Sequence, residues 1–197
     1  MAGEPRQTRI EALLGNETAF LAGRRSYQPH LCPRLAAGPG STRALPGFDL
    51  DVIKVAREQL PFVSKNKLLE IMPDAPPRQA TPRRLGIVLS GGPAPGGHNV
   101  IAGLFHAAKQ AHPDSQVIGF LAGPKGIIID KHVEITADMV SKHLNSGGFH
   151  MLGTGRDKID TPQKMKQCRE TCGTLQLSGL VVVGRDDSNT NAAFLAE

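Results

Sequence analysis

The sequence has no tryptophan and a single tyrosine, Tyr27, and aromatic residues make up only 4% of its 197 residues. Proteins that bind single-stranded nucleic acid stack bases on aromatic side chains, so this composition argues against such a surface. Long apolar runs are missing too. None approaches the ~18 residues of a membrane span, and the N-terminus has no apolar signal-peptide core. We therefore expect a cytoplasmic protein that binds neither membrane nor nucleic acid.

Cysteine is scarce and odd in number, with Cys32, Cys168 and Cys172 as its three copies. Three thiols cannot all pair within one chain, and no second Cys or His pair stands at zinc-finger spacing. Cys168 and Cys172 share one face of an expected helix. This pattern predicts free thiols in a protein of a reducing compartment.

An excess of positive charge is confined to the first part of the chain. The net charge is +5, but residues 1–84 hold 13 Lys and Arg against 8 Asp and Glu, whereas residues 85–197 hold 10 of each. A basic nucleic-acid-binding face is therefore not expected on the second part. Ten of the 15 prolines also precede residue 85. We divide the chain into an N-terminal extension and linker, 1–84, and a domain, 85–197.

The extension has weak local patterns. Helical periodicity is present over 8–21 and 49–59, residues 31–46 predict an extended arm, and residues 73–82 predict a linker rich in proline. None of these segments carries enough apolar residues to form a core alone. The extension is expected to pack against something else.

The most informative stretch is a glycine-rich loop that follows an apolar run. Residues 85–89 predict a buried strand, and apolar residues recur at helical spacing from His98 onward. Between them lie four glycines and two prolines: Gly91, Gly92, Gly96, Gly97, Pro93 and Pro95. Such a loop at a helix N-terminus suits phosphate, although a plain tight turn has the same composition. The loop is neither a Walker A motif nor G-x-G-x-x-G.

Further strands and helices are expected to alternate after this loop. Strands are predicted at 116–121, 149–152 and 180–183, with a hairpin or turn at 127–135. Helices are predicted from Thr136 to about 144, from Thr161 to about 173, and from about 186 to the end. This order predicts an α/β fold, a Rossmann-like three-layer arrangement with a parallel sheet of about four strands and helices on both faces.

Polar residues follow three of these strands, and ligands bind at the carboxyl ends of strands in such sheets. They are the Gly91–Gly97 loop, Arg156 with Lys158, and residues 186–190. Glycine N–H groups, an arginine and a carboxylate for Mg²⁺ are the parts of a phosphoryl-transfer site. Simpler roles exist for each. Arg156 could pair with Asp157 or Asp160, and residues 186–188 could cap the last helix. His98 and His106 are expected to lie on the helix surface rather than to act as acid or base.

Three loops carry a resemblance to a known family: GIVLSGGPAPGGHN at 86–99, GTGRDKI at 153–159 and GRDDSNTN at 184–191. They resemble the first three signature loops of phosphofructokinases, and in particular the pyrophosphate-dependent branch of the long plant and protist type. The match runs from about residue 84 to 197, as an N-terminal portion. The segments RSYQP at 25–29 and LCPRL at 31–35 resemble the N-terminal arm of that branch less distinctly.

The resemblance implies a role for each matching position. Gly92 matches the glycine whose N–H contacts the transferred phosphate, and Arg156 matches the catalytic arginine between donor and acceptor. Asp186 matches the Mg²⁺ ligand, and Ser188 falls within the diphosphate-binding loop. Asp187 stands where ATP-dependent relatives have glycine, which implies selection of pyrophosphate over ATP. The implied reaction is phosphorylation of fructose 6-phosphate to fructose 1,6-bisphosphate in glycolysis, by an oligomer when full length.

Two departures from the family pattern leave alternatives open. Arg185 stands where the family has glycine, so it could force the loop away from the phosphates, pair with Asp186 or Asp187 in competition with Mg²⁺, or itself bind phosphate. The sequence also ends before the family's Thr-Ile-Asp-x-Asp segment and the sugar-phosphate motifs, so these 197 residues alone are expected to be inactive. A non-catalytic regulatory subunit, or a truncated copy that binds phosphate or associates with intact chains, is the alternative to an enzyme.

Overall fold

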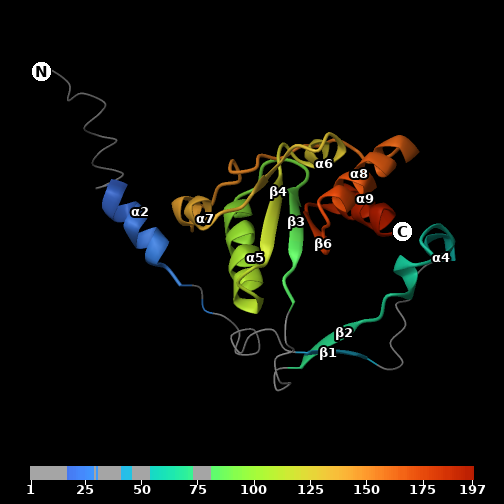
Figure 1. Ribbon diagram of the computed structural model, residues 1–197, viewed down its shortest axis with the longest axis horizontal. Helices are drawn as coiled ribbons and strands as arrows, with labels where there is room; N and C mark the ends of the chain where they lie inside the picture. The colour runs from blue at the N-terminus through green and yellow to red at the C-terminus, as the bar shows by residue number, and fades with distance from the viewer. Residues whose placement is uncertain (1–16, 29, 31–40, 46–53, 73–80) are drawn as a thin grey trace, which may run out of the picture.

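Strand β3 (Arg84–Leu89) lies inside a four-stranded sheet of order β5 (His132–Glu134), β4 (Gln116–Phe120), β3 and β6 (Gly179–Val183). Figure 1 shows β3 between β4 and β6. The computed structural model describes residues 17–28, 30, 41–45, 54–72 and 81–197. β3 pairs in parallel with β4 (Gln116–Phe120) and with β6 (Gly179–Val183). The strands predicted at 85–89, 116–121 and 180–183 are thus confirmed. Their predicted parallel pairing is confirmed as well.

The fourth strand differs from the prediction. It is β5 (His132–Glu134), which pairs antiparallel with β4. Only the short helix α6 (Pro124–Ile128) separates these strands, and a parallel return normally needs a dozen or more residues in the connection. The chain therefore turns back and runs antiparallel, which makes the sheet mixed.

The predicted strand at 149–152 is wrong. These residues form turns, and only an isolated parallel bridge between Ser90 and Gly155 extends the sheet there. The apolar character of the segment has another cause, because Leu152 is buried in the core and its carbonyl accepts from the Ala122 N–H at 2.8 Å. A short buried apolar run does not by itself distinguish a strand from a packed loop.

Helices cover both faces of the sheet, as predicted. One face holds α5 (Gly97–Ala111) and α7 (Ala137–His143), and the other holds α6, α8 (Pro162–Thr174) and α9 (Asp186–Ala196). Two helix starts follow the predicted capping chemistry. The Thr136 side chain accepts from the Met139 N–H, and the Thr161 side chain accepts from the Lys164 N–H.

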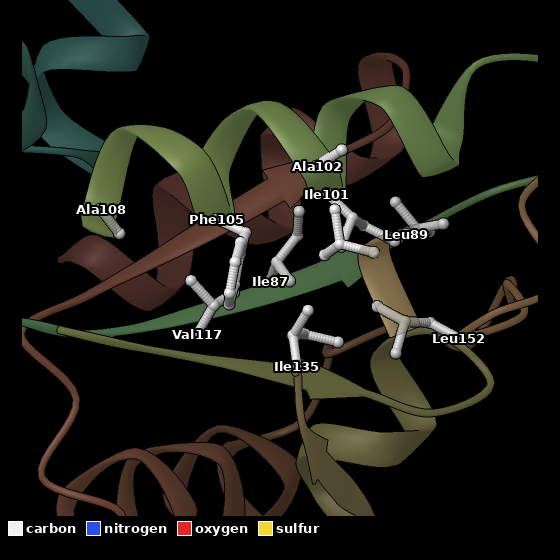
Figure 2. Packing of buried hydrophobic residues seen from close by; sticks show 10 residues of the cluster. Ile87, Leu89, Ile101, Ala102, Phe105, Ala108, Val117, Ile135 and Leu152 are labelled. Atoms are coloured by element: carbon white, nitrogen blue, oxygen red, sulfur yellow. The ribbon is translucent and has the colours of Figure 1, made fainter. Parts of the chain in front are cut away.

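Alternation along β3 divides the core into two layers. Ile87 and Leu89 pack toward α5 and Val88 packs toward the opposite face, as expected for the two-residue period of a strand. Figure 2 shows the first layer, where Ile101 and Phe105 of α5 meet the sheet. Gly86 faces the second layer, where an added Cβ would come within 2.8 Å of Leu177 and 2.9 Å of Leu180.

The described part of the extension contains short elements only. These are α2 (Glu17–Ser26), β1 (Ser41–Ala44), α4 (Lys54–Gln59), the 3-10 helix η1 (Val63–Lys65) and β2 (Leu69–Met72). β1 and β2 form a separate antiparallel pair, which the sequence analysis did not predict. The predicted segments 8–16, 31–40, 46, 49–53 and 73–80, and Cys32, lie outside the described residues.

The described parts of the extension contact the domain at the end of α2 and at the start of η1, as expected for a segment that needs a partner. The Asn145 side chain donates to the carbonyls of Arg24 (2.8 Å) and Tyr27 (3.0 Å) at the end of α2. The Glu197 carboxylate accepts from the N–H groups of Phe62 (2.6 Å) and Val63 (3.0 Å) at the start of η1. Among the helices that the structure describes, none combines the length and apolar composition of a membrane span.

Candidate functional site

The carboxyl ends of β3 and β6 lie side by side, and the residues that follow them form part of the candidate site. Leu89 pairs with Val183 at the last position of both strands, and the Ser90 N–H donates to the Val183 carbonyl at 2.7 Å. The strands are parallel, so the glycine-rich loop after β3 and residues 184–191 after β6 leave the sheet at the same edge. This is the edge at which parallel sheets bind ligands.

A third segment, residues 153–156, is attached to the same edge by hydrogen bonds. The Gly91 N–H donates to the Gly155 carbonyl at 2.7 Å. The Thr154 hydroxyl lies 3.0 Å from the Leu89 carbonyl and 2.9 Å from the Gly91 carbonyl. No pattern in the sequence indicates the roles of Ser90 and Thr154, because these depend on which loops meet in space.

Gly92 and Arg156 lie together at this edge. A Cβ added at Gly92 would come within 3.0 Å of Nη2 of Arg156, and both residues are exposed. Within the described residues, the Gly92 N–H has no hydrogen-bond partner and the Arg156 guanidinium has no ion pair. A backbone donor and a permanent cation therefore face solvent at one point, which is the arrangement that binds a phosphate group.

The alternative partners of Arg156 are not used. Asp160 instead binds Lys164, with Nζ to Oδ1 at 2.8 Å. The Lys164 hydrogen bond lowers the pKa of Asp160, so this carboxylate is occupied by a different cation. Asp157 is exposed and makes no ion pair in the part of the chain that the structure describes. Arg156 is thus available to a ligand.

Asp186 and Asp187 occupy the first turn of α9, just beyond the end of β6. Both are exposed, and neither forms an ion pair with a described residue. Their carboxylates are favourably placed relative to the partial positive charge of the helix N-terminus. No side chain makes a capping hydrogen bond at this helix start, so the capping alternative for residues 186–188 is not realised.

Arg185 precedes this helix without visible strain. Its φ of −106° and ψ of −157° are open to any L-residue, so the expectation that a bulky residue would displace the loop has no support in its backbone geometry. Nor does its guanidinium pair with Asp186 or Asp187 in the described structure. That Arg185 itself binds phosphate stays a prediction.

Ser188 differs from the other predicted site residues because it is buried, with 4% of its surface exposed. Its hydroxyl donates to Oγ of Ser90 at 2.8 Å. This bond joins the first turn of α9 to the residue that starts the glycine-rich loop. Ser188 is positioned to hold two loops together.

The start of α5 is less open than the sequence predicts. The Gly96 N–H donates to the Gly147 carbonyl at 2.9 Å, and the His98 N–H donates to the Gly148 carbonyl at 2.8 Å. Two of the N–H groups expected to bind phosphate are therefore used by the protein itself. The available part of the loop is the end near Gly92.

His98 corrects a second expectation, since it is fully buried rather than on the helix surface, whereas His106 is exposed as predicted. Its ring lies 4.7 Å from that of His143 and 4.6 Å from that of His150, between centroids. Burial, with smaller contributions from charge on these two neighbours, lowers the pKa of His98 to about 4. No sequence motif indicates this cluster, because its members are too far apart in the chain.

The family resemblance implies Mg²⁺, and the residues present fit such an ion. Mg²⁺ in phosphate-binding sites is held by one or two carboxylates together with substrate phosphates and water. The Asp186 carboxylate is exposed and has no competing cation among the described residues. It would hold the ion, and the ion would neutralise charge on the bound phosphates.

Comparison with protein families gives a match over the whole domain. The family described as Phosphofructokinase matches residues 84–197. Among solved structures, the crystal structure of Pichia pastoris phosphofructokinase in the T-state is 23% identical, with a TM-score of 0.48. That match covers 64% of this chain and 14% of the other.

Curated relatives share a more specific description. Pyrophosphate--fructose 6-phosphate 1-phosphotransferase of Porphyromonas gingivalis is 40% identical over 92% of this chain and 33% of its own length. Its counterpart in Treponema pallidum is 55% identical over 58% of this chain and 20% of its own length. Subunit beta 1 from Arabidopsis thaliana is 43% identical over 83% of this chain and 28% of its own length. The chain thus spans a third or less of the length of these relatives.

Proposed function

Since this chain belongs to the phosphofructokinase family, we propose that it forms the phosphoryl-donor-binding region of a pyrophosphate-dependent 6-phosphofructokinase. The whole protein would transfer a phosphoryl group from pyrophosphate to fructose 6-phosphate, as a cytoplasmic step of glycolysis. The relatives described above are named for this reaction. A plant relative is named as a subunit, and for the whole protein we propose assembly into a homo- or hetero-oligomer.

The observation that carries the proposal is the contact between Gly92 and Arg156. A free backbone N–H and an unpaired guanidinium meet at the edge of the sheet, with 3.0 Å between Nη2 and the position of a Cβ at Gly92. In the proposed reaction, the Gly92 N–H and Arg156 hold the oxygens of the transferred phosphate. A fixed cation there stabilises the charge that spreads over this group during transfer.

Asp187 supplies the preference for pyrophosphate. Asp187 lies in the first turn of α9, just beyond the end of β6, and it is exposed. Two like charges ~4 Å apart repel by about 4 kcal/mol at an effective dielectric constant of ~20. Repulsion of this size would weaken binding of a nucleotide α-phosphate several hundredfold. Pyrophosphate ends before it reaches Asp187.

Calorimetric titration of the purified chain tests the proposal. We expect Mg-pyrophosphate to bind to the wild type and ATP not to bind. Arg156→Ala should weaken pyrophosphate binding at least tenfold, since hydrogen bonds to charged groups contribute about 1.5–3 kcal/mol each. Arg169→Ala, an exposed arginine on α8, is the matched control and should bind as the wild type does. Equal binding by both variants would contradict the proposed site.

The specificity variant is Asp187→Gly, which removes the charge. It should admit Mg-ATP while keeping Mg-pyrophosphate. An aldolase-coupled assay for fructose 1,6-bisphosphate, run with each donor on the chain and on a longer protein that contains it, then tests the transfer reaction. Binding without transfer in both would support the alternative, a non-catalytic subunit that binds phosphate.

A further inference from the structure

Three histidines from separate elements meet beside the start of α5. His98 lies in the first turn of α5, His143 ends α7, and His150 lies in the following loop. Their ring centroids are 4.6 to 5.2 Å apart. One possible ligand nitrogen from each ring lies within 4.8 Å of the other two.

Hydrogen bonds orient two of the rings. Nδ1 of His143 lies 2.8 Å from the Met139 carbonyl, which can only accept, so Nδ1 carries the proton and Nε2 carries the lone pair. A histidine whose second nitrogen donates to a backbone carbonyl is the usual arrangement of a metal ligand. His150 is exposed and makes no hydrogen bond with a described residue. Two rings therefore offer unoccupied lone pairs.

His98 has a lone pair that is already in use. The Met151 N–H donates to its Nε2 at 3.0 Å, so Nδ1 carries the proton and lies 2.7 Å from Oγ of Ser146. The Ser146 hydroxyl in turn donates to the His143 carbonyl at 2.7 Å. A metal bound at Nε2 would replace the Met151 bond. The exchange favours the metal, because a single neutral hydrogen bond contributes far less free energy than a bound zinc ion.

The donor set selects the class of metal. Three neutral imidazoles with no carboxylate suit Zn²⁺ and its neighbours Co²⁺, Ni²⁺ and Cu²⁺, and they do not suit Mg²⁺, which prefers oxygen. Tetrahedral zinc places its ligand nitrogens ~3.3 Å apart, with Zn–N near 2.0–2.1 Å. The rings would therefore close by up to about 1.5 Å from the 4.8 Å limit. The segment that has to move contains Gly147 and Gly148, which have no side chains to obstruct the movement.

The position of the cluster indicates its purpose. Residues 143–151 already bind the start of α5 through the Gly147 and Gly148 carbonyls, and the same segment continues into Thr154 and Arg156. A metal shared by α5 and this segment would fix the path of the chain that delivers Arg156 to the edge of the sheet. We propose that His98, His143 and His150 form a three-ligand site for a zinc-class metal ion, with water in the fourth position, separate from the Mg²⁺ of the donor site.

Metal binding to the untagged chain tests this proposal directly. We expect one Zn²⁺ per chain by equilibrium dialysis with elemental analysis, and a rise in Tm of several degrees when Zn²⁺ is in excess over its Kd. His150→Ala removes an exposed ligand without disturbing the core and should weaken Zn²⁺ binding at least tenfold. His106→Ala, an exposed histidine of the same helix, is the matched control and should bind Zn²⁺ as the wild type does.

Cobalt provides a second readout of the ligands. Bound Co²⁺ should give the visible bands of a nitrogen-ligated ion without thiolate charge-transfer absorption, and these bands should be lost in His150→Ala. The proposal is overturned if the wild type takes up no stoichiometric Zn²⁺, or if His150→Ala binds as tightly as His106→Ala. Thiolate absorption in the cobalt spectrum would also overturn it, because it would assign the metal to cysteine.

Discussion

Gly92 has no side chain at a point where one would reach the Arg156 guanidinium. The nearest atom to an added Cβ is the flexible end of Arg156, at 3.0 Å, and the φ of Gly92 is not in the left-handed region. A methyl group there would displace the arginine without straining the backbone. A substitution at Gly92 is therefore expected to weaken ligand binding without lowering the free energy of unfolding.

Gly92→Ala should weaken Mg-pyrophosphate binding roughly tenfold, as expected for a disturbed hydrogen bond to a charged group. Its free energy of unfolding should stay within ~0.5 kcal/mol of the wild type. Calorimetry and urea unfolding measure the two quantities. Gly103→Ala is the control, because Gly103 lies in α5 with nothing within 4 Å of its Cβ position. A Gly92 variant that binds normally would show that Arg156 does not need this space.

Arg185 is a second residue at which a single substitution is informative. Its extended backbone removes the reason to regard it as a damaging replacement of glycine, and its exposed side chain stands beside the two aspartates. Arg185→Gly should weaken Mg-pyrophosphate binding two- to fivefold, as expected for one exposed ionic contact of about 0.4–1 kcal/mol. Tighter binding by the glycine variant, with and without Mg²⁺, would instead mean that Arg185 competes with the metal for the carboxylates.

At the scale of elements, single hydrogen bonds join the loops that carry the site. The bond from Ser188 to Ser90 links α9 to the end of β3 at 2.8 Å, and Ser188 is buried. Ser188→Ala should lower the free energy of unfolding by about 1 kcal/mol, because a buried hydroxyl loses its partner. Urea unfolding measures this change. Asn189→Ala, at the next and exposed position, should leave the unfolding free energy within ~0.5 kcal/mol of the wild type.

Helix α8 places two free thiols against the second core layer. Cys168 is fully buried and Cys172 is half-buried. Burial raises the pKa of Cys168 to about 11 from 9.0, with a smaller contribution from Cys172. The folded state therefore keeps this proton between pH 9 and 11 while the unfolded state loses it, so stability falls as the pH rises through that window.

Alkylation with iodoacetamide at pH 8 checks this environment. Cys168 should react at least tenfold more slowly in the folded chain than in urea, because the thiolate is the nucleophile. Cys172 should show a smaller protection, since it is partly exposed. Mass spectrometry of the two peptide positions reports both rates. Fast reaction of Cys168 in the folded chain would contradict its place in the core.

For the whole molecule, the side chain of Asn145 joins the end of α2 to the domain. Asn145 has a φ of 54° and holds the carbonyls of Arg24 and Tyr27 through one side-chain amide. Asn145→Gly keeps this left-handed conformation accessible and removes these two hydrogen bonds, together with the one that Oδ1 of Asn145 accepts from Asn99 at 3.2 Å. Trypsin should then cleave after Arg24 and Arg25 several times faster than in the wild type. Ser141→Ala, on the exposed face of α7, is the control and should be cleaved at the wild-type rate.

Local patterns in the sequence were sufficient to predict much of the fold. The strands β3, β4 and β6, the caps Thr136 and Thr161, and the glycine-rich loop depend on residues that are neighbours in the chain. Parallel order then requires that residues after these strands reach the same edge. Arg156 was expected at this edge because of a strand at 149–152 that the structure does not contain; the hydrogen bonds of Thr154 and Gly155 to the end of β3 and the following loop bring it close to Gly92 instead.

Tertiary structure decided what depends on distant residues. Residues 149–152 form a packed loop, because Leu152 fills the core there. Two N–H groups at the start of α5 donate to the carbonyls of Gly147 and Gly148. Tertiary packing also buried Ser188 against Ser90 and brought His98 together with His143 and His150. No local pattern encodes such pairings, because hydrogen-bond partners and burial are fixed only when separate segments pack together.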